Sequence, residues 1–207
     1  MFKQFSPNML KTYENCPKKF YLRYVKNISM PVNDEIFELG KNIHALASYY
    51  LRRNNVDKME ASLTSREKEI WEYLKGIKYF SYDVVETEYN LSVKIGENFF
   101  GGRIDALVKN ENTYYILDYK TGAIPKNAKY DFQTIIYMLA VKEFFKSENV
   151  VFVYLDLKNR DEFKIVFDKK LEQEYIKKLK DSVSNINSET IPSKKQECKC
   201  EYSLICY

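Results

Sequence analysis

The 207-residue sequence predicts an α/β domain of the α+β kind, in which helices flank a central mixed sheet that contains an antiparallel meander. Three patterns predict this class. Helical spacing of apolar residues dominates the first third of the chain, apolar and polar residues alternate over 88–120, and helical and strand patterns then follow one another. We expect a single domain over 1–207, with a helical region over about 1–80 and a cysteine-bearing segment over about 196–207.

The helical region is expected to open with two short helices within residues 6–25. Ser6 is a suitable N-cap, and Pro7 suits the first helical position because its missing N–H needs no partner there. Cys16 and Pro17 then interrupt or re-cap the helix. The sequence therefore predicts a break at this point and not one continuous helix.

The later elements follow from the same two periodicities. Helices are predicted where apolar residues recur every three or four positions, and strands where they alternate with polar ones. Short turn sequences separate the three strands of the meander, which makes them antiparallel neighbours. The expected helices cover 34–54, 66–77, 129–146 and 169–186, the meander strands 88–95, 99–108 and 114–120, two further strands 150–157 and 163–167, and a polar linker 187–196.

Composition limits the class of protein only loosely. Lys and Arg total 33 against 29 Asp and Glu, a net charge of +4 that neither requires nor excludes a polyanionic partner. The opening MFKQFSPNML lacks the apolar core of a signal peptide, and the longest apolar runs are too short to span a bilayer. We therefore expect a soluble, cytoplasmic protein without a membrane partner. The 18 Tyr and 13 Phe would serve a core or base-stacking surfaces equally well.

The stretch LDYKTG, residues 117–122, carries the first chemical signal. Strand side chains alternate between faces, so Asp118 and Lys120 point the same way. Asp105 lies on the preceding strand of the meander, where facing residues come within about 5 Å at their β-carbons. Two carboxylates this close need a cation between them, and their hard oxygens suit Mg²⁺ or Mn²⁺. A surface ion pair of Asp118 with Lys120, unrelated to Asp105, is the alternative.

Three residues on predicted helices could join such a site. His44, the one histidine of the chain, lies at the edge of an apolar stripe with Gly40 one turn before it, so its ring could reach the sheet. A histidine beside a core face is more often a core residue than a ligand. Gln133 and Tyr137 are i and i+4 neighbours on one helical face. Helix packing is the ordinary use of such a pair, and phosphate contact is the functional one.

Taken in order, these stretches resemble one nuclease family almost from end to end. SPNMLKTYENCPKKFYLRYV, GKNIH, GGRIDAL, LDYKTG and QTIIY follow one another as they do in the PD-(D/E)XK nucleases of the RecB and AddB type. This family includes iron–sulfur exonucleases associated with CRISPR adaptation. The resemblance implies a restriction-endonuclease-like core and phosphodiester hydrolysis assisted by Mg²⁺ or Mn²⁺.

The resemblance also implies a role for each motif residue. The implied metal ligands are His44, Asp105, Asp118 and the backbone carbonyl of Tyr119. The implied catalytic residues also include Lys120, which would position the attacking water and balance charge, and Gln133 with Tyr137, which would hold DNA beside the metal. An acidic residue on the strand before Asp105 also recurs in the family, and either Glu86 or Glu88 could match it.

The four cysteines stand at the two ends of the chain, at Cys16, Cys198, Cys200 and Cys206. An intracellular chain argues against disulfides, and four thiolates make one complete ligand set for Zn²⁺ or an iron–sulfur cluster. The family has one early cysteine and a late trio that hold a [4Fe–4S] cluster, so the resemblance implies a structural cluster that closes the C-terminal segment onto the first helix. One residue separates Cys198 from Cys200 where the family has two, which keeps structural Zn²⁺ as the alternative.

These expectations combine into one function. With the resemblance, they imply a metal-dependent deoxyribonuclease, an exonuclease that hydrolyses phosphodiester bonds in single-stranded DNA or at DNA ends, with single strands or frayed ends preferred. The resemblance implies work in DNA repair, recombination or CRISPR adaptation, with a helicase or CRISPR integrase proteins as partners. Two other classes stay open: a DNA-binding module that is catalytically idle or activated by a partner, and an interaction domain stapled by a metal.

Overall fold

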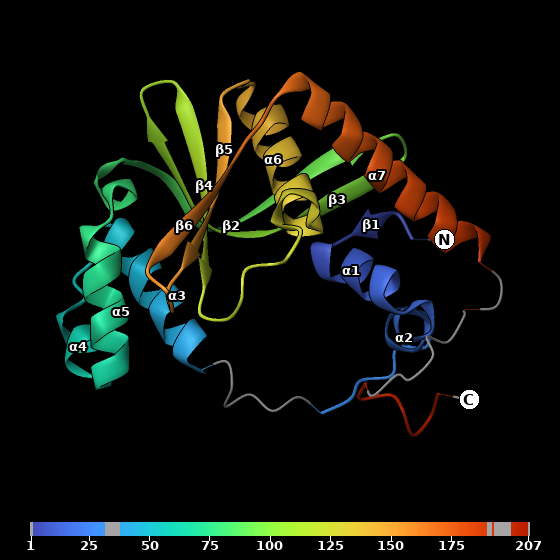
Figure 1. The fold of residues 1–207 in the computed structure, drawn as a ribbon, viewed down its shortest axis with the longest axis horizontal. Helices are drawn as coiled ribbons and strands as arrows, with labels where there is room; N and C mark the ends of the chain where they lie inside the picture. Colours follow the sequence, from blue (N-terminus) through green and yellow to red (C-terminus); the bar gives the residue numbers. More distant parts are fainter. Residues whose placement is uncertain (1, 32–37, 190–191, 193–199, 207) are drawn as a thin grey trace.

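A mixed sheet of six strands runs through the centre of the computed structural model, with helices on both faces (Figure 1). The structure describes residues 2–31, 38–189, 192 and 200–206. β2 pairs along one edge of β3, whereas β1 and β4 share the other edge, and β5 and β6 extend the sheet beyond β4. The strands are β1 (Gln4–Phe5), β2 (Asp83–Ile95), β3 (Asn98–Asn110), β4 (Thr113–Lys120), β5 (Val150–Asp156) and β6 (Asp161–Val166).

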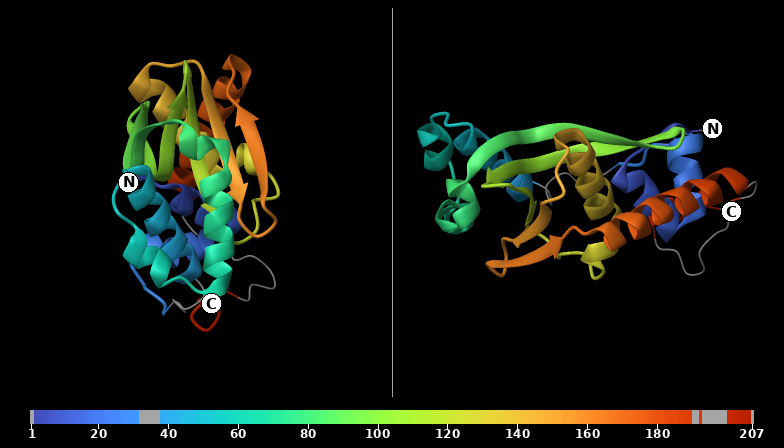
Figure 2. Two further views of the ribbon diagram at one scale, coloured as in Figure 1. Left: turned by 90° about the vertical axis from the view of Figure 1, so that its left-hand side faces the viewer. Right: turned by 90° about the horizontal axis from the view of Figure 1, so that it is seen from above.

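The strand directions confirm a mixed sheet around an antiparallel meander. β2, β3 and β4 are antiparallel neighbours, β4 and β5 are parallel, and β5 and β6 are antiparallel. The parallel pair requires a crossover, which α6 (Phe132–Phe145) provides. β2 and β3 are the longest strands, and Figure 2 shows their hairpin reaching from the end of the molecule near α5 to the N-terminal segment.

Local sequence signals explain where several helices begin. The hydroxyl of Ser6 accepts a backbone N–H of the first turn of α1, and the thiol sulfur of Cys16 does the same for α2, so the predicted break is confirmed. None of the helices in the described ranges combines the length and apolar character that crossing a bilayer requires. The remaining helical segments are α1 (Pro7–Asn15), α2 (Pro17–Phe20), η1 (Tyr21–Val25), α3 (Glu38–Leu51), α4 (Asp57–Ala61), α5 (Ser65–Gly76), η3 (Lys78–Ser81), η4 (Ala128–Tyr130) and α7 (Lys169–Ser188).

Two hydrophobic clusters, one on each face of the sheet, form the core. Ile116 and Phe152 pack toward α6 and α7, whereas the next residues along their strands, Leu117 and Val153, pack toward α3 and α5. Strand side chains alternate between faces, so a strand covered by helices on both sides is apolar at consecutive positions. This explains the unbroken apolar run of β5. It also means that α3 and α6 cover opposite faces of the sheet.

The structure corrects several predicted boundaries. The meander strand expected at 88–95 begins at Asp83, because the extra residue Val85 forms a bulge that obscures the alternation before it. The two-residue strand β1 was not expected, since so short a segment carries no periodicity. The third helix begins at Glu38 among the described residues, and the start expected at residues 34–37 lies outside them.

The C-terminal residues 200–206 lie against the N-terminal helices. Lys19 Nζ forms an ion pair with Glu201 at 2.9 Å, and the buried Tyr202 donates its hydroxyl to the Ile28 carbonyl at 2.8 Å. Figure 1 shows this segment beside α2, although 182 positions separate Lys19 from Glu201. The expected closure of the chain ends is therefore confirmed for residues 200–206. The part of the expected segment at 196–199 lies outside the described residues.

Candidate metal centre and active site

The candidate site begins where β3 and β4 part. Their pairing ends at Ala106 and Leu117, so Asp105 and Asp118 are the next residues at the point of separation. β1 pairs with the same edge of β3 only up to Phe100. Between these two neighbours, residues 101–105 have no described strand on this edge. Side chains from the helices can therefore approach β3 here.

His44 reaches the sheet from α3. Its Nδ1 lies 3.3 Å from Asp105 Oδ1, and its Nε2 lies 3.0 Å from the backbone carbonyl oxygen of Tyr119. Asp105 Oδ2 in turn accepts the backbone N–H of Tyr119 at 2.9 Å. Gly40 keeps the approach close, because a β-carbon there would lie 3.3 Å from Thr121 Oγ1. The expectation that the imidazole reaches the sheet is confirmed, and three predicted ligand groups meet at this point.

Both ring nitrogens of His44 face oxygen acceptors, so the ring without a cation favours its doubly protonated form. Burial alone would lower the pKa of His44, but the hydrogen bond and negative charge of Asp105, with help from the Tyr119 carbonyl, raise the pKa above its ordinary value. A cation that binds either nitrogen must displace a proton first. Metal binding and proton release are therefore coupled at this residue.

Glu88 supplies a further carboxylate to the same point. It falls opposite Asp105, since the residues on either side of each are paired with one another. Its backbone has a φ of +50°, a left-handed conformation that is uncommon for a residue with a β-carbon. Ligand atoms of His44, Glu88 and Asp105 all lie within 4.8 Å of one another. Two carboxylates and an imidazole fit Mg²⁺ or Mn²⁺, with Mn²⁺ more tolerant of the nitrogen ligand.

Arg52, the residue that directly follows α3, is bonded to the residue before Glu88. Arg52 Nε donates to Thr87 Oγ1 at 2.6 Å, and Arg52 Nη2 donates to the Thr87 carbonyl oxygen at 2.5 Å. Ser48, one turn earlier on α3, shares a 2.8 Å hydrogen bond with the same hydroxyl. α3 therefore holds both His44 and the residue that precedes Glu88, so two of the converging donors depend on one helix.

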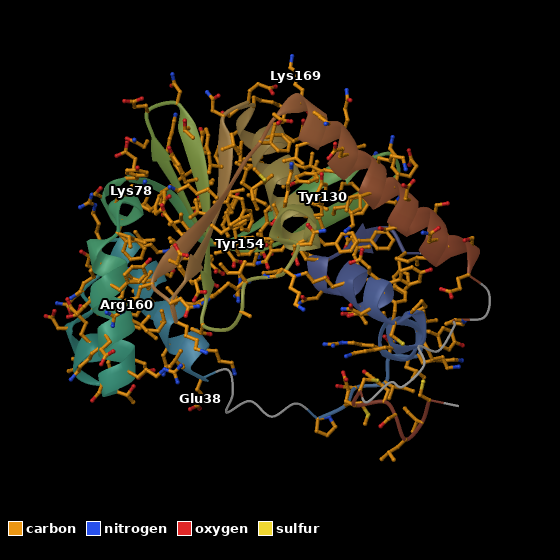
Figure 3. All side chains as sticks on the ribbon, viewed as in Figure 1. Glu38, Lys78, Tyr130, Tyr154, Arg160 and Lys169 are labelled. Atoms are coloured by element: carbon orange, nitrogen blue, oxygen red, sulfur yellow. The ribbon has the colours of Figure 1, made fainter. Side chains whose placement is uncertain are left out.

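Asp118 and Lys120 lie on one side of β4, as the period of two predicts. Lys120 Nζ is 2.7 Å from Asp118 Oδ2, an ion pair without the alignment of a good hydrogen bond. Gln133 links the two residues, since its amide nitrogen donates to Asp118 Oδ1 and its amide oxygen accepts from Lys120 Nζ at 3.2 Å. Lys120 also lies 5.6 Å from the ring centre of Tyr154, which Figure 3 labels near the middle of the sheet.

Asp118 is almost fully buried, at 2% exposure of the residue. Burial, and then the charge of Asp105, raise its pKa to about 6, although Lys120 and His44 act in the opposite direction. Keeping this carboxylate ionised therefore costs free energy, even with Lys120 beside it. In this structure Asp118 faces Gln133 and Lys120, and it is not among the three donors within 4.8 Å of one another.

Tyr137 lies one helical turn after Gln133 and is buried. Its hydroxyl donates to the Arg103 carbonyl oxygen at 2.9 Å, in the stretch of β3 that has no described partner strand on the edge opposite β2. A β-carbon on Gly102 would lie only 2.8 Å from that hydroxyl, so the glycine makes room for the tyrosine. The helix-packing use of Tyr137 is therefore present in the structure, and its contact with DNA stays a prediction.

The cysteines at the two chain ends are only partly described. Cys16 and Cys206 are buried and Cys200 is half-buried, whereas Cys198 lies outside the described residues. The ion pair between Lys19 and Glu201 brings the neighbour of Cys200 to the helix that Cys16 caps. The two chain ends that carry the thiols are thus in contact, although the three described cysteines do not converge as His44, Glu88 and Asp105 do. A shared metal site at the cysteines stays a prediction.

Glu88 is the site residue that the sequence left open. The turn at Gly96 offered a signal for it: a two-residue hairpin turn fixes the register of the whole pair, and this register places Glu88 opposite Asp105. Glu86 pairs with Leu107 instead, which lies two positions along β3 from Asp105, inside the stretch where β3 and β4 are still paired. Arg52 carried no comparable signal, because its partner Thr87 is distant in sequence.

A mixed sheet with carboxylates, a lysine and a histidine at the point where two central strands part is the arrangement of a metal-assisted phosphodiester hydrolase. The sequence model of the PD-(D/E)XK nuclease superfamily matches residues 4–81 and 63–207. These matches cover nearly the whole chain. The protein belongs to the PD-(D/E)XK nuclease superfamily.

Two individual proteins show the extent of the similarity. The CRISPR-associated exonuclease Cas4 of Francisella tularensis subsp. novicida is 28% identical over 123 residues, which are 57% of this chain and 61% of the relative. The match thus spans less than two thirds of the relative's length. A crystal structure from Eubacterium rectale, of a protein whose exonuclease description is itself an inference, aligns over 96% of this chain and 86% of its own with a TM-score of 0.62 and 13% identity. The latter similarity concerns the fold alone.

Proposed function

We propose that this protein is a divalent-metal-dependent deoxyribonuclease that removes nucleotides from single-stranded DNA or from DNA ends. The observation that carries the proposal is the convergence of His44, Glu88 and Asp105 within 4.8 Å, beside the Asp118 and Lys120 pair. An interaction domain stapled by a metal would need none of these five residues. The exonuclease description of the Francisella relative supports action from an end.

The donor atoms support Mg²⁺ or Mn²⁺ as the cation. His44, Glu88 and Asp105 would hold it, with Asp118 and the Tyr119 carbonyl as the remaining predicted ligands. When bound, the cation would polarise the scissile phosphodiester and lower the pKa of a water molecule. Lys120 would orient that water and stabilise the negative charge that develops at phosphorus. Gln133 would keep Lys120 and Asp118 in place through its two hydrogen bonds.

A second, structural metal site is proposed at the cysteines. Cys16, Cys198, Cys200 and Cys206 would hold a [4Fe–4S] cluster, with Zn²⁺ as the alternative because only one residue separates Cys198 from Cys200. The contact of residues 200–206 with α2 supports a shared site at the chain ends. Its role would be to fasten the C-terminal segment, since hydrolysis needs no electron transfer.

DNA is the proposed partner, with preference for single strands or frayed ends. The printed association of the Francisella relative with CRISPR supports a role beside CRISPR integrase proteins, and a helicase is the partner expected for a role in repair.

The test is digestion of DNA labelled at its 5′ or 3′ end, single-stranded and duplex, in Mg²⁺, Mn²⁺ or EDTA, with circular single strands alongside. We expect metal-dependent release of nucleotides from linear single strands and little from circles. Asp105→Asn should abolish cleavage, whereas Asp83→Asn, an exposed aspartate at the start of β2, should leave it unchanged. Equal digestion in EDTA, or by the Asp105→Asn variant, would contradict the proposal.

A further inference from the structure

An open cavity of about 920 Å³ lies between the N-terminal segment and the β2–β3 hairpin. The hairpin contributes Asn90, Ser92, Phe99 and Gly101 to its lining, and the N-terminal half of the chain contributes residues that include Tyr24 and Asn27. Neither the metal-binding residues nor the predicted DNA contacts Gln133 and Tyr137 line it. Its use is therefore separate from the chemistry of the metal site.

The cavity and the candidate metal site lie along the same strand, β3. β1 leaves β3 after Phe100, and β4 joins it only at Ala106, so residues 101–105 form one unpaired stretch of edge among the described strands. The cavity lies at its beginning, lined by Gly101 and Gly102, and the metal site lies at its end, at Asp105. Asp105 lies three positions further along the strand than Gly102, which is about 10 Å. A single polymer can occupy both places at once.

An exposed face of the same hairpin runs in the same direction. Asn90, Ser92 and Lys94 are exposed and alternate with buried residues on β2. Their partners across the strands are Arg103, Gly101 and Phe99, and opposite residues of an antiparallel pair lie on one face.

The next pair on this face, toward the metal site, is Glu88 opposite Asp105, so Arg103 lies beside the donors and Lys94 lies further along the same face. Arg103, with a 65% exposed side chain, already contacts Glu88 at 2.9 Å, and Lys94 lies 5.8 Å from the ring centre of Phe99.

The residues that line the cavity indicate which kind of molecule it binds. Phe99 is 42% exposed, and with Tyr24 it offers aromatic surface for stacking. The side-chain amides of Asn27 and Asn90 can donate and accept hydrogen bonds, as the edges of nucleobases require. Among the described residues that line the cavity none is acidic, and Lys3 carries a positive charge. An apolar peptide would leave these amides unpaired, whereas an unpaired base satisfies both the rings and the amides.

We propose that this cavity receives an unpaired base of the same DNA strand whose phosphodiester lies at the metal site, and that Arg103 and Lys94 face the phosphates around it. The inference rests on the proposed function and adds to it a fixed subsite for a base beyond the scissile bond. It also gives a structural reason for a preference for single strands, because a paired base cannot enter the cavity. Figure 2 shows the hairpin that connects the two places.

The test measures binding of fluorescently labelled single-stranded oligonucleotides to the whole protein in EDTA, where no cleavage occurs. One base at a time is replaced by an abasic residue along the strand. We expect one or two neighbouring positions at which the abasic residue weakens binding about fivefold or more, as the loss of one base–aromatic stack does. Phe99→Ala should weaken binding of the intact strand by a similar factor and should remove the abasic effect at that position.

Phe144→Ala is the matched control. Phe144 is an exposed phenylalanine too, at 57%, but it lies at the end of α6 and outside the cavity lining. This variant should bind like the parent and keep the position-dependent abasic effect. Both substitutions remove exposed rings, so both variants are expected to fold. A flat abasic series in the parent, or equal loss of binding in Phe99→Ala and Phe144→Ala, overturns the inference.

Cleavage in Mn²⁺ separates this inference from the proposed function. If the parent cuts DNA but shows no position-dependent abasic effect, the base subsite is wrong and the nuclease proposal stands. If the abasic effect is present and is lost in Phe99→Ala while no variant or condition gives cleavage, the base subsite stands and the nuclease proposal fails. Where both hold, Phe99→Ala should raise KM more than it lowers kcat, because the base contact lies away from the reacting phosphate.

Discussion

Arg52 donates two hydrogen bonds to Thr87, one to its hydroxyl and one to its carbonyl oxygen, and Thr87 immediately precedes Glu88. Glu88 has a left-handed backbone and turns its carboxylate toward His44 and Asp105. Such a conformation persists only where the surroundings hold it. His44 lies on α3 and Arg52 directly follows its last residue, Leu51, so α3 sets the positions of two candidate ligands although only one of them belongs to it.

Arg52→Gln should therefore weaken metal binding without unfolding the protein. We expect about a tenfold loss of Mn²⁺ affinity, the size typical when a residue that orients a ligand is removed. Isothermal titration calorimetry with Mn²⁺ measures this directly. Arg53→Gln changes the neighbouring exposed arginine and should leave the affinity unchanged, and Arg52→Lys should recover part of the loss. If Arg52→Gln binds Mn²⁺ like the parent, Glu88 does not depend on this contact or is not a ligand.

Asp118→Asn should abolish cleavage but stabilise the metal-free protein. The raised pKa of about 6 means that the folded state binds a proton more tightly than the unfolded state, for which the ordinary value is 3.8. Stability is therefore lost as the pH rises from about 4 to above 6, by about 2–3 kcal/mol in total. An uncharged amide removes that loss.

Urea denaturation in EDTA at pH 7.5 and pH 4.5 measures the difference. The variant should exceed the parent in stability at pH 7.5, and the advantage should shrink at pH 4.5. Single-stranded DNA binding should be at least as strong as in the parent, since one negative charge is removed. A variant that is less stable than the parent at pH 7.5, or that still cuts DNA in saturating Mn²⁺, would falsify the account of Asp118.

The sequence predicted those parts of the site that rest on local rules. The period of two in a strand is a local rule, and it put Asp118 and Lys120 on one side of β4. The predicted meander placed Asp105 on the strand next to them, because the turn residues between the strands can be recognised in the sequence. Arg52 with Thr87 is different, since it joins residues 35 positions apart through the packing of α3 against β2. No periodicity records such a contact, and the same holds for the two-residue strand β1.

Gly102→Ala should destabilise the fold through Tyr137. The new β-carbon would lie 2.8 Å from the Tyr137 hydroxyl and 3.1 Å from its Cε1, so the ring must shift and its hydrogen bond to Arg103 is lost. We expect a loss of about 1–3 kcal/mol in the free energy of unfolding, measured by urea denaturation. Tyr137→Phe alone should cost about 1 kcal/mol for the hydrogen bond.

The double variant provides the control for this contact. Removing the hydroxyl relieves the tighter of the two clashes, so Gly102→Ala with Tyr137→Phe should lose less than the sum of the two single variants. Strict additivity would mean that the alanine destabilises the strand for another reason. A purely entropic effect of the alanine would instead raise the stability slightly.

Cys16→Ser should lower thermal stability and metal content before it affects cleavage, because the proposed metal–thiolate bonds join the chain ends and lie apart from the reacting groups. A cross-link that closes so long a loop stabilises by several kcal/mol, so a loss of about 3 kcal/mol, or roughly 6–12 °C in Tm, is expected for a domain of this size.

Elemental analysis for iron and zinc on the purified parent identifies the metal, and the variant should hold less of it. After treatment with a strong chelator, parent and variant should melt together. If the untreated variant keeps the metal content and Tm of the parent, Cys16 is not a ligand.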